Sequence, residues 1–118
     1  MHPPTVFIID DDATVREAIT LLLEHEEIHV QSFASADAFL SAYHPDFIGC
    51  ILLDICMPGK DGMQLHEELK QRQSKLPIIF LTGHGDIPQS VKAIKAGAID
   101  FLTKPVTRVK LLASIRSA

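Results

Sequence analysis

Long hydrophobic runs are missing from this sequence. No apolar stretch approaches the ~20 residues that a helix needs to cross a bilayer. The first residues, Met1 to Pro4, have neither the basic start nor the apolar stretch of a secretory signal peptide. We therefore expect a cytoplasmic protein that makes no contact with a membrane.

Cysteine is scarce, and positive charge is not concentrated anywhere. Cys50 and Cys56 lack C-x-x-C spacing, so we interpret both as reduced thiols rather than as a disulfide or a redox pair. The six histidines are interpreted as scattered surface residues rather than as a zinc site. The Lys and Arg residues are dispersed and the net charge is −4, which argues against nucleic-acid binding by this segment itself.

Short apolar runs alternate with amphipathic stretches five times along the chain. Residues 5–9, a β-branched and aromatic run typical of a buried strand, and residues 48–53, 77–81 and 99–102 are expected to form strands. Residues 28–33 instead alternate with period two, which indicates a strand nearer a sheet edge. Strands that alternate with helical stretches indicate βαβ units, a parallel sheet and helices on both of its faces. The predicted fold class is α/β, a doubly wound (βα)5 three-layer sandwich.

Capping residues mark several of the expected helix starts. Thr14 and Glu17 have the spacing of a capping box before the first helix, and Ser35 is the expected N-cap of the second. Asp86 is placed to cap the fourth helix, and the fifth begins from Thr107. Asp12 is expected to be solvated or to help cap the first helix. The less favoured interpretation is that Asp12 is a third metal ligand.

The polar residues that end the strands carry the functional signal. Asp10–Asp12 ends the first strand, Asp54 the third and Thr82 the fourth, while the fifth leads to Lys104. Ligands of open α/β sheets bind at the carboxyl ends of the strands, so these groups should converge. Clustered carboxylates suit a hard cation such as Mg²⁺, and a carboxylate beside a cation and a hydroxyl can take up a phosphoryl group.

At this point the chain resembles the receiver domain of bacterial response regulators over its whole length. The resemblance rests on the acidic pair after the first strand, the Asp-x-x-Met-Pro-x-x-x-Gly run from Asp54 to Gly62, Thr82-Gly83, and Lys104-Pro105. Residues 82–86 and 95–101 look like the FixJ-type branch. The resemblance implies a flavodoxin-like fold with strand order 2-1-3-4-5.

The resemblance also implies a role for each residue of the phosphorylation site. Asp54 would be the phosphoacceptor and a metal ligand. Asp11 would bind Mg²⁺ directly, Asp10 mainly through water, and Cys56 through its backbone carbonyl. Lys104 would pair with Asp54 and later with the phosphoryl group.

Three further positions are implied to belong to a switch. Thr82 would bind a phosphoryl oxygen after transfer, and Phe101, at the aromatic switch position, would turn inward as Thr82 moves. The peptide bond before Pro105 is expected to be cis. The surface that would change comprises the fourth helix, the fifth strand and the fifth helix.

The expected partners follow from the same resemblance. A sensor histidine kinase would supply the phosphoryl group, and the phosphorylated form would dimerise. Residues 1–118 would form one receiver domain, and a LuxR-type DNA-binding output domain is expected to be absent from this chain. Such a domain is not a conventional enzyme, although it promotes its own phosphorylation and dephosphorylation.

Two other functions remain open from the sequence. Asp10-x-Asp12-x-Thr14 matches the motif of haloacid dehalogenase-type phosphatases, in which Asp10 would be the nucleophile. However, a helix begins where that family places an insertion. The chain could also be a receiver-like module that binds partners without being phosphorylated. A flavodoxin-like nucleotide binder is disfavoured because the loop after the first strand is acidic.

Overall fold

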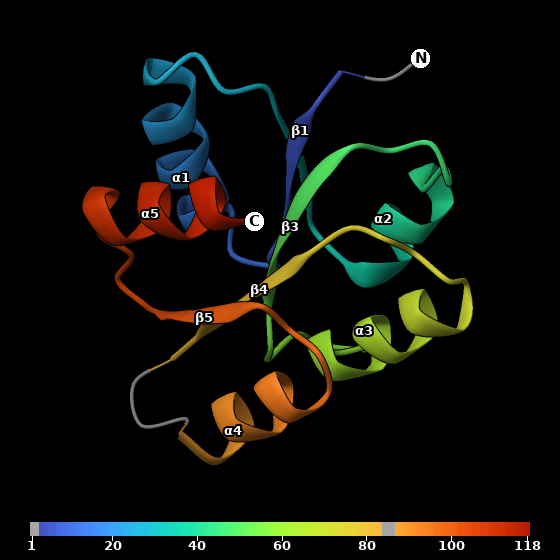
Figure 1. The fold of residues 1–118 in the computed structure, drawn as a ribbon. Coiled ribbons are helices and arrows are strands. Elements are labelled where there is room, and N and C mark those ends of the chain that lie inside the picture. Colours follow the sequence, from blue (N-terminus) through green and yellow to red (C-terminus); the bar gives the residue numbers. More distant parts are fainter. Residues whose placement is uncertain (1–2, 84–86) are drawn as a thin grey trace.

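A computed structural model describes residues 3–83 and 87–118 of the chain. Within these residues, five strands alternate with five helices (Figure 1). The strands are β1 (Thr5–Ile9), β2 (Val30–Phe33), β3 (Gly49–Asp54), β4 (Ile78–Thr82) and β5 (Asp100–Thr103). The helices are α1 (Ala13–His25), α2 (Ala36–Ala42), α3 (Gly62–Gln71), α4 (Ile87–Lys95) and α5 (Arg108–Ser117).

All strand pairs are parallel, and the sheet has the order β2-β1-β3-β4-β5. Helices α1 and α5 cover one face of the sheet, and α2, α3 and α4 lie on the other side (Figure 1). The predicted doubly wound three-layer sandwich and its strand order are confirmed. No helix in the described part of the chain combines the length and apolarity needed to span a membrane.

The central strands β1, β3 and β4 carry apolar side chains between their end residues because both of their faces are covered. Phe7 and Ile9 of β1 pack toward α2 and α3, whereas Val6 and Ile8 pack toward α1 and α5. Each of these four side chains is buried. Burial on both faces explains why the strands read as continuous hydrophobic runs instead of alternating patterns.

The helix starts differ partly from the expectation. Asp12 is the N-cap of α1, and its carboxylate accepts a hydrogen bond from the Thr14 N–H at 2.9 Å. The predicted capping box of Thr14 and Glu17 is therefore wrong, because the helix already begins at Ala13. The Ser35 cap of α2 is confirmed, with its hydroxyl accepting from the Ala38 N–H.

Two other expected helix starts have different outcomes. Thr107 precedes α5 as expected, but its side chain makes no capping hydrogen bond. The expected cap Asp86 lies outside the described residues, as does His84 of the same motif.

Candidate functional site

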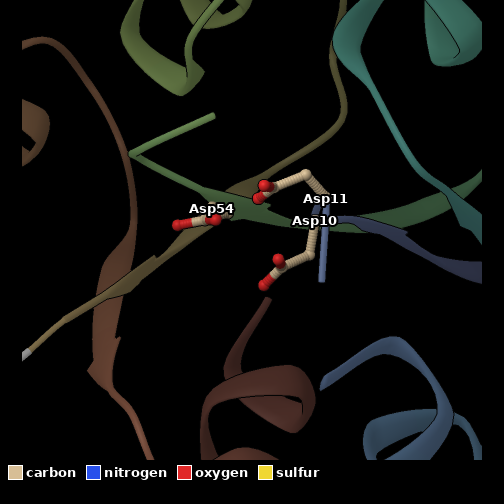
Figure 2. Close-up of side chains that lie close together, drawn as sticks. All are labelled: Asp10, Asp11 and Asp54. Carbon is tan, nitrogen blue, oxygen red and sulfur yellow. The ribbon is translucent and has the colours of Figure 1, made fainter. Parts of the chain in front are cut away.

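Three carboxylates meet where β1 and β3 end. Asp10 and Asp11 follow β1, and Asp54 is the last residue of β3. One oxygen from each carboxylate can be chosen so that all three lie within 4.8 Å of one another. Figure 2 shows the three side chains gathered around one space at the ends of these strands. The convergence expected from the strand order is therefore present.

The three acids differ in exposure. The Asp10 side chain is fully buried, the Asp54 side chain is 7% exposed, and Asp11 faces solvent. Oδ1 of Asp10 accepts a hydrogen bond from the Asp12 N–H at 2.9 Å. Oδ2 of Asp10 is also buried, and a buried carboxylate oxygen is costly unless a cation lies close to it.

Lys104, which follows β5, supplies a positive charge to the cluster. Its ammonium nitrogen lies 2.8 Å from Oδ2 of Asp10 and 3.4 Å from Oδ2 of Asp54. Burial by itself would lower the pKa of Lys104, but the hydrogen bond and charge of Asp10, together with Asp54, outweigh burial and raise it. Lys104 is thus held in its charged form between the two buried acids.

The Asp54 carboxyl is in an environment that disfavours its charge. Burial and then the neighbouring charge of Asp10 raise its pKa to about 6. The ammonium of Lys104 and the Cys56 N–H, which donates to Oδ1 of Asp54 at 3.2 Å, act in the opposite direction. One lysine therefore does not neutralise the cluster, and the site still favours a further cation.

Thr82 and Phe101 lie on β4 and β5, the two strands that follow β3 in the sheet. Thr82 is buried, and its hydroxyl donates to the carbonyl of Leu102 at 3.5 Å. Phe101 is 39% exposed. The peptide bond between Lys104 and Pro105 is cis. In this structure the Thr82 hydroxyl is thus directed to β5, and the aromatic ring is partly in solvent.

A family model for the "Response regulator receiver domain" matches residues 6–116. The chain is 45% identical to the "Response regulator protein TodT" of Pseudomonas putida over 113 residues, which is 96% of this chain and 50% of that protein. It is 44% identical to the "Transcriptional regulatory protein FixJ" of Bradyrhizobium diazoefficiens over 96% of this chain and 55% of that protein. The chain thus spans about half the length of these relatives.

Solved structures of response regulators have the same fold as this chain. The response regulator StyR superposes with a TM-score of 0.91 at 45% identity, covering 98% of this chain and 59% of that one. Full-length FixJ from B. japonicum gives a TM-score of 0.89 at 42% identity, covering 99% and 58%. The chain belongs to the response regulator receiver domains. Receiver domains are signalling modules of two-component systems rather than conventional enzymes, and they interact with histidine kinases.

Receiver domains bind Mg²⁺ at an acidic cluster of this kind, and the donor set of this receiver domain fits the ion. Carboxylate oxygens are the hard ligands that Mg²⁺ takes in proteins. The three carboxylates share this space with the ammonium of Lys104, whose one positive charge leaves negative charge that a divalent cation would neutralise. The fit rests on these features of the chain as well as on the family.

A zinc pattern in the sequence has no counterpart in the fold of this receiver domain. His25-Glu26-Glu27-Ile28-His29 has H-E-x-x-H spacing. However, α1 ends at His25, and Glu27 has a left-handed φ of 61°. The two histidines therefore do not share one helical face, as zinc ligation by this motif requires. Among the described residues, the only group arranged to hold a metal is that of the three aspartates.

Asp61 and Gly62 have roles near the site that were not predicted from the sequence. Asp61 forms a capping box with Gln64 at the start of α3. The signal was present, because Asp-x-x-Gln before an amphipathic run is a helix-start pattern. At Gly62, a Cβ atom would lie 2.4 Å from the Asp54 carbonyl oxygen, so α3 approaches the backbone of Asp54 very closely there.

Proposed function

We propose that this receiver domain accepts a phosphoryl group from a histidine kinase onto Asp54 in the presence of Mg²⁺. The observation that carries the proposal is the meeting of Asp10, Asp11 and Asp54 within 4.8 Å, with Lys104 2.8 Å from Asp10. Asp10, Asp11, Asp54 and the backbone carbonyl of Cys56 would hold the ion. Bound Mg²⁺ would neutralise the phosphoryl oxygens during transfer.

The transfer is a substitution at phosphorus. An Asp54 carboxylate oxygen forms the new P–O bond while the P–N bond of the kinase phosphohistidine breaks, and the electron pair leaves with the imidazole nitrogen. Lys104 attracts the oxygens of the transferred group, and Asp54 must be ionised to attack. The pKa of Asp54, raised to about 6, leaves it mostly ionised near pH 7.

The mapping of the labelled residue tests the proposal. We expect acetyl phosphate with Mg²⁺ to label Asp54 of the wild-type chain, as located by mass spectrometry, and expect Asp54→Asn to abolish the label. Asp12→Asn is the matched control, because it removes a negative charge from the turn between β1 and α1 while Asn still caps a helix. Label on Asp10 would instead support phosphatase chemistry, and unlabelled wild type would support a binding module.

A switch following phosphorylation forms the second part of the proposal. The Thr82 hydroxyl would leave the Leu102 carbonyl and donate to a phosphoryl oxygen. Phe101 would then turn inward from its 39% exposed position. A local charge event of this kind biases an element that has two packed arrangements.

The surface formed by α4, β5 and α5 is the expected place for dimerisation. Among the described residues, its exposed large apolar side chains are Val91, Ile94, Ile99, Phe101 and Val109. Val91→Glu should keep Asp54 labelling and prevent labelled chains from dimerising in size-exclusion chromatography. Leu21→Glu is a matched control, because Leu21 is also exposed but belongs to α1 on the other side of the sheet. Dimerisation would in turn control a LuxR-type DNA-binding output domain in the full-length protein.

A further inference from the structure

The side chain of Arg16 reaches back from the first turn of α1 to the acidic turn. Its Nη1 donates to the carbonyl oxygen of Asp10 at 2.7 Å. Its backbone N–H donates to the carbonyl of Asp12 at 3.1 Å. Arg16 therefore binds the main chain at both ends of the Asp10–Asp12 turn, although it comes from the helix that follows.

The position of Arg16 does not serve the helix itself. A cation in the first turn opposes the helix macrodipole, which favours negative charge at that end. The first turn of α1 contains no acidic residue, and the negative charge at this helix start comes from the N-cap Asp12. A residue that is unfavourable for its own helix, as a cation is at a helix N-terminus, often makes a functional contact elsewhere. Here the contact is the hydrogen bond to the Asp10 carbonyl.

The hydrogen bond from Arg16 restrains the peptide that joins the two acids. The peptide group is planar, so fixing the Asp10 carbonyl also fixes the N–H of Asp11 and the direction of its Cα. Asp10 has additional restraints from the Asp12 N–H and from Lys104. The exposed Asp11 carboxylate has no hydrogen bond or ion pair with any described residue. Its direction therefore depends mainly on its backbone.

We propose that Arg16 is a positioning residue of the metal site, holding the Asp10–Asp11 peptide so that both carboxylates face one ion together with Asp54. The inference rests on the proposed function. Partners that orient metal ligands commonly contribute about tenfold or more to metal affinity. Arg16 does this through a backbone carbonyl instead of a ligand side chain.

Charge and positioning predict opposite effects on Mg²⁺ binding. Loss of a positive charge near an acidic site should strengthen the binding of a cation, by an amount that solvent and salt reduce for this half-buried side chain. Loss of positioning should weaken it. The sign of the change in Mg²⁺ dissociation constant for Arg16→Gln therefore separates the two roles.

The experiment measures Mg²⁺ binding to the 118-residue chain by isothermal titration calorimetry, with urea unfolding in EDTA alongside. We expect Arg16→Gln to raise the dissociation constant about tenfold. Arg16→Lys keeps the charge but lacks the planar guanidinium, so it should show a smaller loss and remains informative if the Gln variant is unfolded. Arg72→Gln is the matched control, because it removes an equal charge from an ion pair with Glu68 at the end of α3.

Three results would overturn the inference. These are an unchanged or tighter dissociation constant in Arg16→Gln, wild-type affinity in Arg16→Lys, and a lowered urea midpoint with unchanged affinity in the folded protein. Each would assign Arg16 to charge screening or to general stability. The proposed function fails separately, if the wild-type chain binds no Mg²⁺ or takes up no label on Asp54.

Discussion

Nζ of Lys104 lies 3.4 Å from Oδ2 of Asp54, yet this cation does not restore an ordinary acidity to the carboxyl. Burial, followed by the charge of Asp10, raises the pKa of Asp54 to about 6, which disfavours its ionised form in the folded state. The ionised Asp54 carboxylate therefore destabilises the metal-free folded state, and binding of a cation or phosphorylation of Asp54 changes this electrostatic energy. This relationship connects the stability of the domain to its chemistry.

The first prediction concerns the pH dependence of the metal-free protein. A pKa raised from 3.8 to about 6 means that folding is favoured by protonated Asp54 at low pH. This contribution is complete below pH 4 and is lost as the pH rises through 6, and it amounts to at most about 3 kcal/mol. Asp54→Asn should therefore raise the urea midpoint in EDTA at pH 8, and the gain should vanish near pH 4. A gain of equal size at both pH values would contradict this origin.

His66 should make the stability of the folded protein depend on pH in the opposite direction to Asp54. It was interpreted from the sequence as a surface residue, but it is buried on α3 with its ring 5.6 Å from that of Phe80. Burial, with the charge of Lys70, lowers the pKa of His66, so the folded state favours the neutral ring. The stability that it contributes is present above pH 6.5 and is lost as the pH falls.

A comparison of Asp54→Asn with the double variant Asp54→Asn, His66→Leu isolates this effect. The thermal midpoint of the single variant should fall between pH 7 and pH 5, and that of the double variant should stay nearly constant. Parallel changes in the two proteins would show that the ring is protonated as readily in the folded state as in the unfolded state.

Gly62 and Gly49 should affect different properties when replaced by alanine. A Cβ at Gly62 would lie 2.4 Å from the Asp54 carbonyl oxygen, so Gly62→Ala must displace the backbone of the phosphoacceptor. We expect labelling by acetyl phosphate to slow by about tenfold to a hundredfold, because small misplacements of reacting groups are costly. The labelling rate is measured per folded molecule.

Gly49→Ala is the control for general destabilisation. Gly49 has φ of 131° and opens β3 at the end remote from Asp54, where a Cβ would lie 1.8 Å from the Thr5 carbonyl oxygen. We expect a loss of stability of about 3 kcal/mol or more. The labelling rate of the folded fraction should remain unchanged. A slower rate in Gly49→Ala would mean that the labelling reports stability and not geometry.

The two cysteines should differ in reactivity toward iodoacetamide. Burial raises the pKa of the Cys50 thiol to about 11, whereas Cys56 is exposed. The thiolate is the reactive form, so at pH 8 we expect mass spectrometry to find alkylation of Cys56 in the folded protein and of both cysteines only in urea. Early alkylation of Cys50 would indicate that β3 opens at its first residues.

The sequence by itself determined the elements and their order. The buried strands β1, β3 and β4 are apolar between their end residues, so local hydrophobicity was enough to place them within one or two residues. The sequence also predicted that Asp10, Asp11 and Asp54 lie at one edge of the sheet, because parallel strands direct their carboxyl ends to the same side. Helix starts were less certain, since several polar residues competed for one cap, and Asp12 rather than Thr14 occupies it.

Only the tertiary structure decided which side chains touch across these elements. The burial of His66 against Phe80, the approach of Gly62 to Asp54 and the bond from Arg16 to the Asp10 carbonyl all depend on how a helix is rotated and seated. Hydrophobic periodicity indicates which face of a helix is buried, but it does not fix distances of a few ångströms. Those distances come from the packing of the whole domain, and they set the charge and geometry of the site.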